Sequence, residues 1–201
     1  MSKARDIADS TKTLDVDGGT IKLDGNYPVG TNNVALGDAA FGSGNLTGGG
    51  NTAIGREASF SNTSGQHNVA LGQAANYAIT TGTSNVGVGS QALRFTTTAD
   101  NNTAVGYQSL YTNVTGADNT AFGAYSLYSN TTGTRNVGVG KHALLAATTG
   151  NDNVAVGFVA ADSLTTASNT TAIGSWALAG NTTGSNNTGI GYRALYLNTT
   201  A

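Results

Sequence analysis

Apolar and small residues alternate within a pentamer that recurs along nearly the whole chain. The pentamer reads Asn, Val or Thr, Ala or Gly, an apolar residue, and Gly. The first interval between its copies is 18 residues and the other eight are 17. A fixed period of this kind predicts a solenoid, so residues 32–201 are expected to form one array of about ten coils. The closing glycines of the pentamers are Gly37, Gly55, Gly72, Gly89, Gly106, Gly123, Gly140, Gly157, Gly174 and Gly191.

Each coil is expected to contain two short strands. Within the pentamer the residues on either side of the Ala or Gly, such as Val34 and Leu36, share one face of a strand because side chains alternate with period two. A leucine recurs four residues after the glycine, as at Leu93 and Leu110, and predicts a second strand. Polar loops follow, with glycines such as Gly116 where a positive φ is favourable. The fold class is therefore all-β.

The apolar core of such a coil is thin. Leu, Ile, Val and Phe make up 38 of 201 residues, cysteine is absent, and the net charge is only −2. Small cores generally need disulfides, metals or oligomerisation, so self-association is expected. The Ala and Gly positions, such as Ala104 and Ala121, are predicted to offer the flat surface through which parallel copies approach.

The repeats resemble those of known fibrous proteins. "NVALG", "NTAIG" and "NVGVG" are similar to the head repeat of trimeric autotransporter adhesins of the YadA type, and "NTAVGYQSLYTNVTG" resembles repeats in tail-fibre-like proteins of bacteriophages. The opening "MSKARDIAD" is similar to the start of marine-phage fibre proteins. This resemblance implies a left-handed parallel β-roll that forms a homotrimer about its long axis.

The function implied is that of a structural virion protein, a phage tail fibre or fibre shaft that mediates or spaces host attachment. A cell-surface trimeric adhesin head is the main alternative. An ice-binding solenoid is less favoured, because its threonines should form an unbroken column, whereas the column that begins Val34, Thr52, Val69 mixes Val and Thr.

Other chemistry is weakly represented. Glu57 is the only glutamate, so a paired-carboxylate active site is hard to build and no enzymatic activity is expected. His67 and His142 lie at different phases of the repeat, and no metal or other cofactor is expected. A pI near 5.5 argues against nucleic acid, and no apolar run reaches the length of a membrane span. Because no secretory signal is recognisable, the protein is expected to assemble in a host cytoplasm and to reside in the virion.

Two sets of residues are singled out within the array. The first is structural and includes a ladder of stacked asparagine amides: Asn102, Ala104, Val105, Gly106, Asn119, Ala121, Phe122 and Gly123. The second is a candidate surface for a receptor, a host glycan or protein: Tyr77, Tyr107, Tyr111, Tyr128, Trp176, Tyr192 and Tyr196. Packing between protomers explains these aromatic residues as well, and the sequence leaves both interpretations open.

Residues 1–31 carry no repeat, hold Pro28, the only proline, and concentrate charge. We expect this segment to order on other virion proteins of the tail, baseplate or capsid, or else to cap the first coil or form a disordered tail. At the other end, Ala201 falls inside a polar loop, which suggests a processed or truncated fibre or a partner that covers the end.

Overall fold

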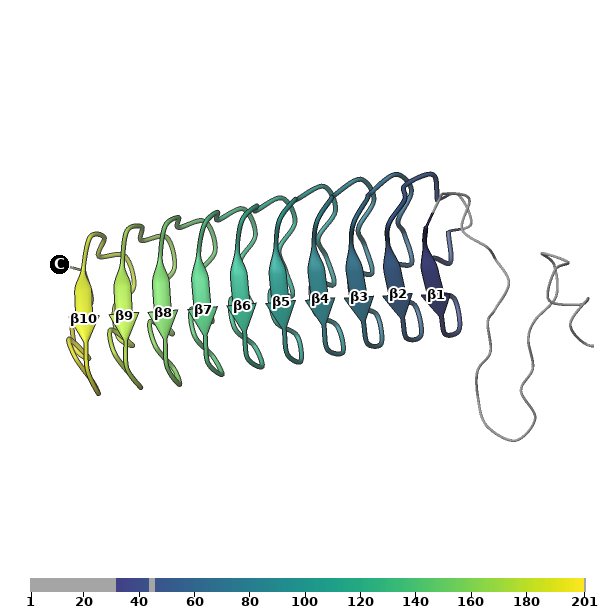
Figure 1. Cartoon of the computed structure of the whole chain (residues 1–201). Helices are drawn as coiled ribbons and strands as arrows, with labels where there is room; N and C mark the ends of the chain where they lie inside the picture. The colour runs from purple at the N-terminus through teal and green to yellow at the C-terminus, as the bar shows by residue number, and fades with distance from the viewer. Residues whose placement is uncertain (1–31, 44–45, 201) are drawn as a thin grey trace, which may run out of the picture.

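The chain is a parallel β-solenoid. A computed structural model describes residues 32–43 and 46–200, within which every regular element is a three-residue strand. All strands are parallel and lie side by side in sequence order, so each coil adds one strand to a single sheet (Figure 1). The strands are β1 (Val34–Leu36), β2 (Thr52–Ile54), β3 (Val69–Leu71), β4 (Val86–Val88), β5 (Thr103–Val105), β6 (Thr120–Phe122), β7 (Val137–Val139), β8 (Val154–Val156), β9 (Thr171–Ile173) and β10 (Thr188–Ile190).

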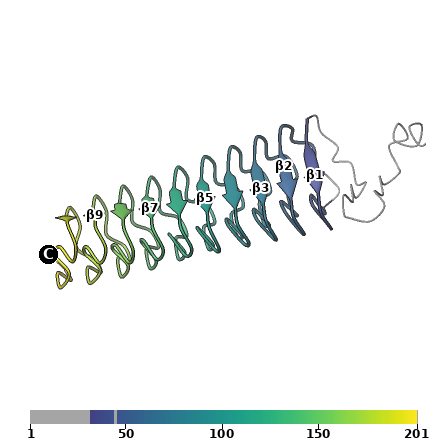
Figure 2. The ribbon, with the colours of Figure 1, turned by 60° about the horizontal axis from the view of Figure 1, so that its bottom comes forward.

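Strand register follows the sequence period. Thr103 pairs with Thr120, 17 residues on, and Val34 pairs with Thr52 across the one longer interval. The coils consequently stack one behind another along a single axis, as a second view also shows (Figure 2). The expected solenoid is confirmed, and the repeat is its structural unit. Residues 1–31 and Ala201 lie outside the described residues, so the expectations made for them stay predictions.

The second strand predicted in each coil is wrong. The segment after the pentamer forms a turn in which alternate residues have positive φ, as at Gln108 (51°) and Leu110 (51°). The turns nevertheless bond from coil to coil, because the Leu110 N–H donates to the Ser126 carbonyl at 2.9 Å. Left-handed residues other than glycine cost about 1–2 kcal/mol each, so this turn depends on the stacking and burial that accompany it.

The Ala and Gly column does not form a surface for other copies. Ala104 and Ala121 are fully buried inside the coil of their own chain, where they face the equally buried Leu110 and its equivalents. The predicted docking role of this column is therefore wrong. Because side chains alternate across a strand, the flanking apolar residues point outward, and Phe122 is 56% exposed.

The pentamer glycine is required for two reasons. At Gly106 φ is +134°, a conformation that residues with a side chain rarely adopt. A Cβ at this position would also lie 2.6 Å from the carbonyl carbon of Gly123 in the next coil. The loop glycines have a different explanation from the one expected: Gly116 does not have a positive φ, but its Cβ would lie 2.3 Å from the Gly133 carbonyl oxygen.

The asparagine ladder is confirmed. Asn102 is fully buried, and its Oδ1 accepts the backbone N–H of Asn119 at 3.0 Å and the Asn119 amide at 3.2 Å. Its Nδ2 donates to Asn85 Oδ1 at 3.1 Å and to the Gly116 carbonyl at 2.9 Å. Each asparagine thus joins its strand to the neighbouring coils on both sides. Thr170 interrupts the ladder but still donates its N–H to Asn153 Oδ1 at 3.0 Å.

Candidate recognition surface

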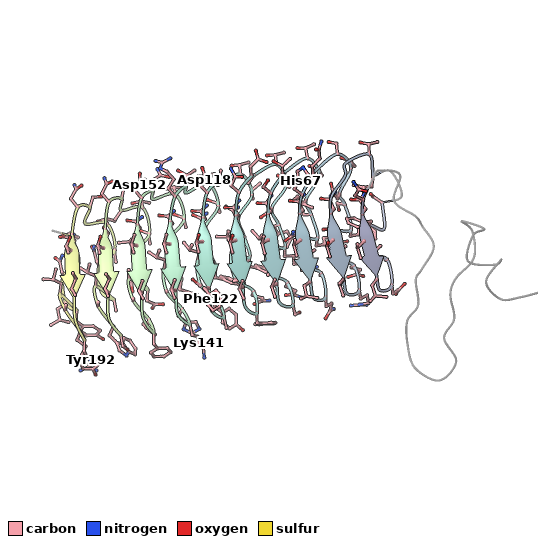
Figure 3. The ribbon with its side chains drawn as sticks, viewed as in Figure 1. His67, Asp118, Phe122, Lys141, Asp152 and Tyr192 are labelled. Carbon is pink, nitrogen blue, oxygen red and sulfur yellow. The ribbon has the colours of Figure 1, made fainter. Side chains whose placement is uncertain are left out.

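The aromatic residues gather along one edge of the sheet. They occupy the first, second, fifth and sixth positions after the pentamer glycine, so the turn that follows each strand carries them all to the edge at which the strands end. Phe122, Lys141 and Tyr192 mark this edge, opposite His67, Asp118 and Asp152 (Figure 3). We call the following side chains the aromatic strip: Phe60, Tyr77, Arg94, Phe95, Tyr107, Tyr111, Tyr125, Tyr128, Lys141, His142, Phe158, Trp176, Tyr192, Arg193 and Tyr196.

Neighbouring rings of the strip contact one another from coil to coil. Tyr111 and Tyr128 stack with their centroids 5.1 Å apart and their planes 2° from parallel. Tyr107 meets Tyr125 edge to face at 5.3 Å. Further along the rod, Trp176 meets Tyr196 edge to face at 6.1 Å. Such pairs contribute about 0.5–1.5 kcal/mol beyond their burial, so the strip stabilises the stack of coils within one chain.

Two arginines complete the strip. The Arg94 guanidinium lies 5.1 Å from the centre of the Tyr77 ring and 5.6 Å from that of Phe95. Arg193 lies in the same way 5.3 Å from the Tyr192 ring and 5.4 Å from the Tyr196 ring. All seven predicted aromatic residues belong to one continuous series of side-chain contacts, which runs from Phe60 to Tyr196. The two arginines, Phe95 and His142 bridge the gaps in it.

The sequence interpretation missed Arg94, Phe95, Lys141, His142 and Arg193 as members of this surface. The signal was present, because Arg94 lies five residues after its pentamer glycine, as Tyr111 and Tyr128 do. The prediction rested on the aromatic residues at these phases and left out the cations beside them. Ring packing inside one chain is also a third explanation for the aromatics, beside ligand contact and packing between protomers.

Only part of the strip is open to solvent. Tyr107 and Phe158 are each 46% exposed and Tyr192 is 70% exposed. Tyr77, Tyr111, Tyr128, Trp176 and Tyr196 are half-buried. A ligand that lies along this edge would therefore contact a few exposed rings, which pack against half-buried ones.

Three carboxyl groups follow the strands on this edge: Asp38 and Glu57 in the first two coils, and Asp162 further along. Asp162 follows β8 at the position that Tyr128 occupies after β6, and its Oδ1 is shielded from solvent and without a hydrogen-bond partner. Desolvation raises the pKa of the Asp162 carboxyl, and the nearby His142 partly offsets that rise. Desolvation likewise raises the pKa of the Tyr125 phenol, with smaller contributions from Tyr107 and Tyr128.

The opposite edge is polar and carries its own ion pair. Arg135 donates to Asp152 through Nε at 2.7 Å and through Nη2 at 2.9 Å. These hydrogen bonds lower the pKa of the Asp152 carboxyl. The pair therefore stabilises the fold at pH values above the pKa that Asp152 has in the unfolded chain. This contribution is lost as the pH falls through the lower pKa that Asp152 has in the folded protein. Both side chains are exposed, so the contribution is small.

A column of hydroxyls on the loop between coils was also missed. Thr131 donates its hydroxyl to the Thr148 carbonyl at 3.1 Å, and Thr132 beside it is exposed. The same exposed position is filled by Ser64, Thr81, Thr98, Thr115, Thr149, Thr166 and Thr183. This column has no break from Ser64 to Thr183, whereas the strand column on which the ice-binding alternative was less favoured mixes Val and Thr.

The described part of the chain shows no further site. No helix there is long and apolar enough to cross a membrane. Across residues 32–43 and 46–200, no group of three His, Asp or Glu side chains is placed to hold a metal ion. Comparison with protein-family models, curated proteins and solved structures found no match.

Proposed function

We propose that the chain is a structural, non-enzymatic virion protein, a phage tail fibre or fibre shaft that mediates or spaces attachment to the host. In this proposal three copies associate in parallel as a homotrimer of left-handed β-rolls. Residues 1–31 bind tail, baseplate or capsid proteins, and the rod projects from the particle with its aromatic strip toward the host surface.

The observation that carries this proposal is the outer face of the sheet. Parallel sheets are normally covered on both faces, but here one face of ten strands has no covering layer within the described residues. Leu71, Phe122 and Ile173 on that face are 44%, 56% and 39% exposed, and half-buried Val and Thr side chains lie between them. A contiguous apolar patch of this kind marks an interaction site, and a face that repeats at 17 residues suits an identical rod in parallel register.

Lysines placed on this face should separate the protomers without unfolding them. We expect the wild-type protein to have three times the mass of one chain by light scattering, and the double variant Val105→Lys, Val139→Lys to be a folded monomer. Both residues are half-buried in the single chain and point away from its core, so the coil itself can accept the change. Thr149→Lys, exposed on the loop between coils, is the matched control and should leave the trimer intact. A wild-type monomer would contradict the proposal.

The virion role has a separate test. Deleting residues 1–24 should yield soluble trimers that are no longer incorporated into particles, because the described coils bond to one another along residues 46–200. The composition of purified virions measures the effect. Incorporation at the wild-type level would show that attachment to the particle does not depend on the amino-terminal segment.

A further inference from the structure

Beyond the first two coils, which carry Asp38, Arg56 and Glu57 on the strip edge, the two edges of the rod differ in charge. From β4 onward the aromatic strip holds three cations, Arg94, Lys141 and Arg193, and its edge holds one acid, Asp162. The opposite edge over the same coils contains Asp100, Asp118 and Asp152 with a single cation, Arg135. The sequence as a whole hides this difference, because its net charge is only −2.

The strip cations also differ in pairing. Arg135 on the opposite edge is bonded to Asp152 through two nitrogens. Among the described residues, by contrast, Arg94, Lys141 and Arg193 form no ion pair. Lys141 and Arg193 are exposed, and Arg94 rests on aromatic rings with its Nε shielded and without a hydrogen-bond acceptor. These cations are therefore available to an anion from outside.

Their spacing is regular along the rod. Arg94 follows β4, Lys141 follows β7 and Arg193 follows β10, so successive cations are three strand steps apart. At about 4.8 Å per step, this separation is roughly 14 Å. Exposed rings lie between and beside them, at Tyr107, Phe158 and Tyr192. Asp162, the one acid on this edge from β4 onward, opposes an anion, but the three cations outnumber it.

We propose that the aromatic strip binds an acidic polysaccharide that lies along the rod, with sugar rings on the exposed aromatic faces and carboxylate or sulfate groups at Arg94, Lys141 and Arg193. This inference deepens the proposed function, since it names the ligand class of the strip. It rests on that proposal in one respect, that the strip faces a cell surface. Aromatic faces suit the apolar C–H faces of sugars, and arginine and lysine suit their anionic substituents.

Charge density favours a polysaccharide over single-stranded nucleic acid. A protein that follows a nucleic-acid backbone has a densely basic groove, since every nucleotide carries a phosphate. The strip offers only one cation in about 14 Å. Most of its rings also pack against one another, which leaves few faces free for bases to stack. A polymer with sparse anionic groups fits this arrangement better.

The test uses the purified full-length protein and matched polymers in isothermal titration calorimetry at low salt. The probes are polygalacturonate methyl-esterified to leave about one free carboxylate in three sugars, its fully methyl-esterified form, hyaluronate, neutral dextran and oligo(dT). We expect at least one of the two acidic polysaccharides to bind, with an affinity that falls as salt is added, and we expect the methyl ester and dextran not to bind. The methyl ester retains the sugar backbone of polygalacturonate and lacks only the charge.

Three variants place the binding on the strip. Lys141→Gln removes an exposed cation and should weaken binding about fivefold, as expected for a charged contact at a surface. Phe158→Ala removes an exposed ring and should weaken binding by a similar factor. Arg135→Gln is the matched control, because it removes a cation from the opposite edge, and it should leave the affinity unchanged. Circular dichroism of each variant checks that it is folded.

Several outcomes would overturn the inference: no binding to either acidic polymer, equal binding of polygalacturonate and its ester, tighter binding of oligo(dT), or an equal loss of affinity in Arg135→Gln and Lys141→Gln. Light scattering on the same samples tests the fibre proposal independently. A monomer that binds hyaluronate through Lys141 would refute the trimer and support the acidic-polysaccharide site. A trimer that binds no acidic polymer would support the trimer and refute the acidic-polysaccharide site.

Discussion

Gly106→Ala is expected to destabilise the rod by roughly 2–6 kcal/mol and to unfold the coils around β5 and β6. About 1–3 kcal/mol comes from a side chain at a φ of +134°, and about 1–3 kcal/mol from a Cβ placed 2.6 Å from the Gly123 carbonyl carbon. The backbone fixes the position of the Cβ and the Gly123 carbonyl carbon belongs to the main chain, so no rotamer change relieves the contact. Denaturant unfolding and hydrogen exchange of the neighbouring amides measure the effect.

Gly191→Ala is the matched control for the stacking part of this effect. Its φ is +122°, but a Cβ there meets no atom within 4 Å. The control variant should therefore incur only the backbone cost of about 1–3 kcal/mol. Equal losses of stability in the two variants would show that close approach of successive coils is not what requires a glycine.

Asn102→Ala is expected to cost roughly 2–4 kcal/mol. The substitution leaves the buried N–H of Asn119 without its acceptor and removes the donor to the Gly116 carbonyl, and a buried unsatisfied group alone costs about 1–3 kcal/mol. The midpoint of denaturant unfolding measures the loss. In the opposite direction, Thr170→Asn should stabilise the rod by about 1 kcal/mol, because it supplies the amide that the ladder lacks in that coil.

The adjacent Asn101 provides the comparison. It is exposed, has a φ of 61° and makes one side-chain bond, to Asp118 at 3.2 Å. Asn101→Gly keeps the backbone conformation accessible and should change stability by less than about 1 kcal/mol. If Asn101→Gly and Asn102→Ala proved equally harmful, the ladder of buried amides would not be a special source of stability.

The seven aromatic residues illustrate how far the sequence could lead toward the recognition surface. They lie at the first, second or fifth position after the pentamer glycine, and the structure brings all of them to one edge. Arg94 shares the phase of Tyr111, but its contacts with Tyr77 and Phe95 could not be predicted because they depend on how the turn places these side chains. Whether a ring is open, like Tyr192, or half-buried, like Tyr196, likewise depends on how adjacent coils overlap.

The sequence by itself determined the period, the strand positions, the register and the buried asparagine ladder, because each depends on residues that recur at a constant separation. The second apolar position was read as a strand, since local alternation cannot reveal that residues such as Leu110 have a positive φ. Only the tertiary structure decided which face of the strand is inside. The narrow coil has room for Ala104 opposite Leu110 but not for larger side chains, so Val105 and Phe122 point outward. Hydrophobicity alone would have placed the larger side chains inside and the Ala and Gly side outside. The tertiary structure reverses this, because the turns set the width of the interior and close only when the coils stack.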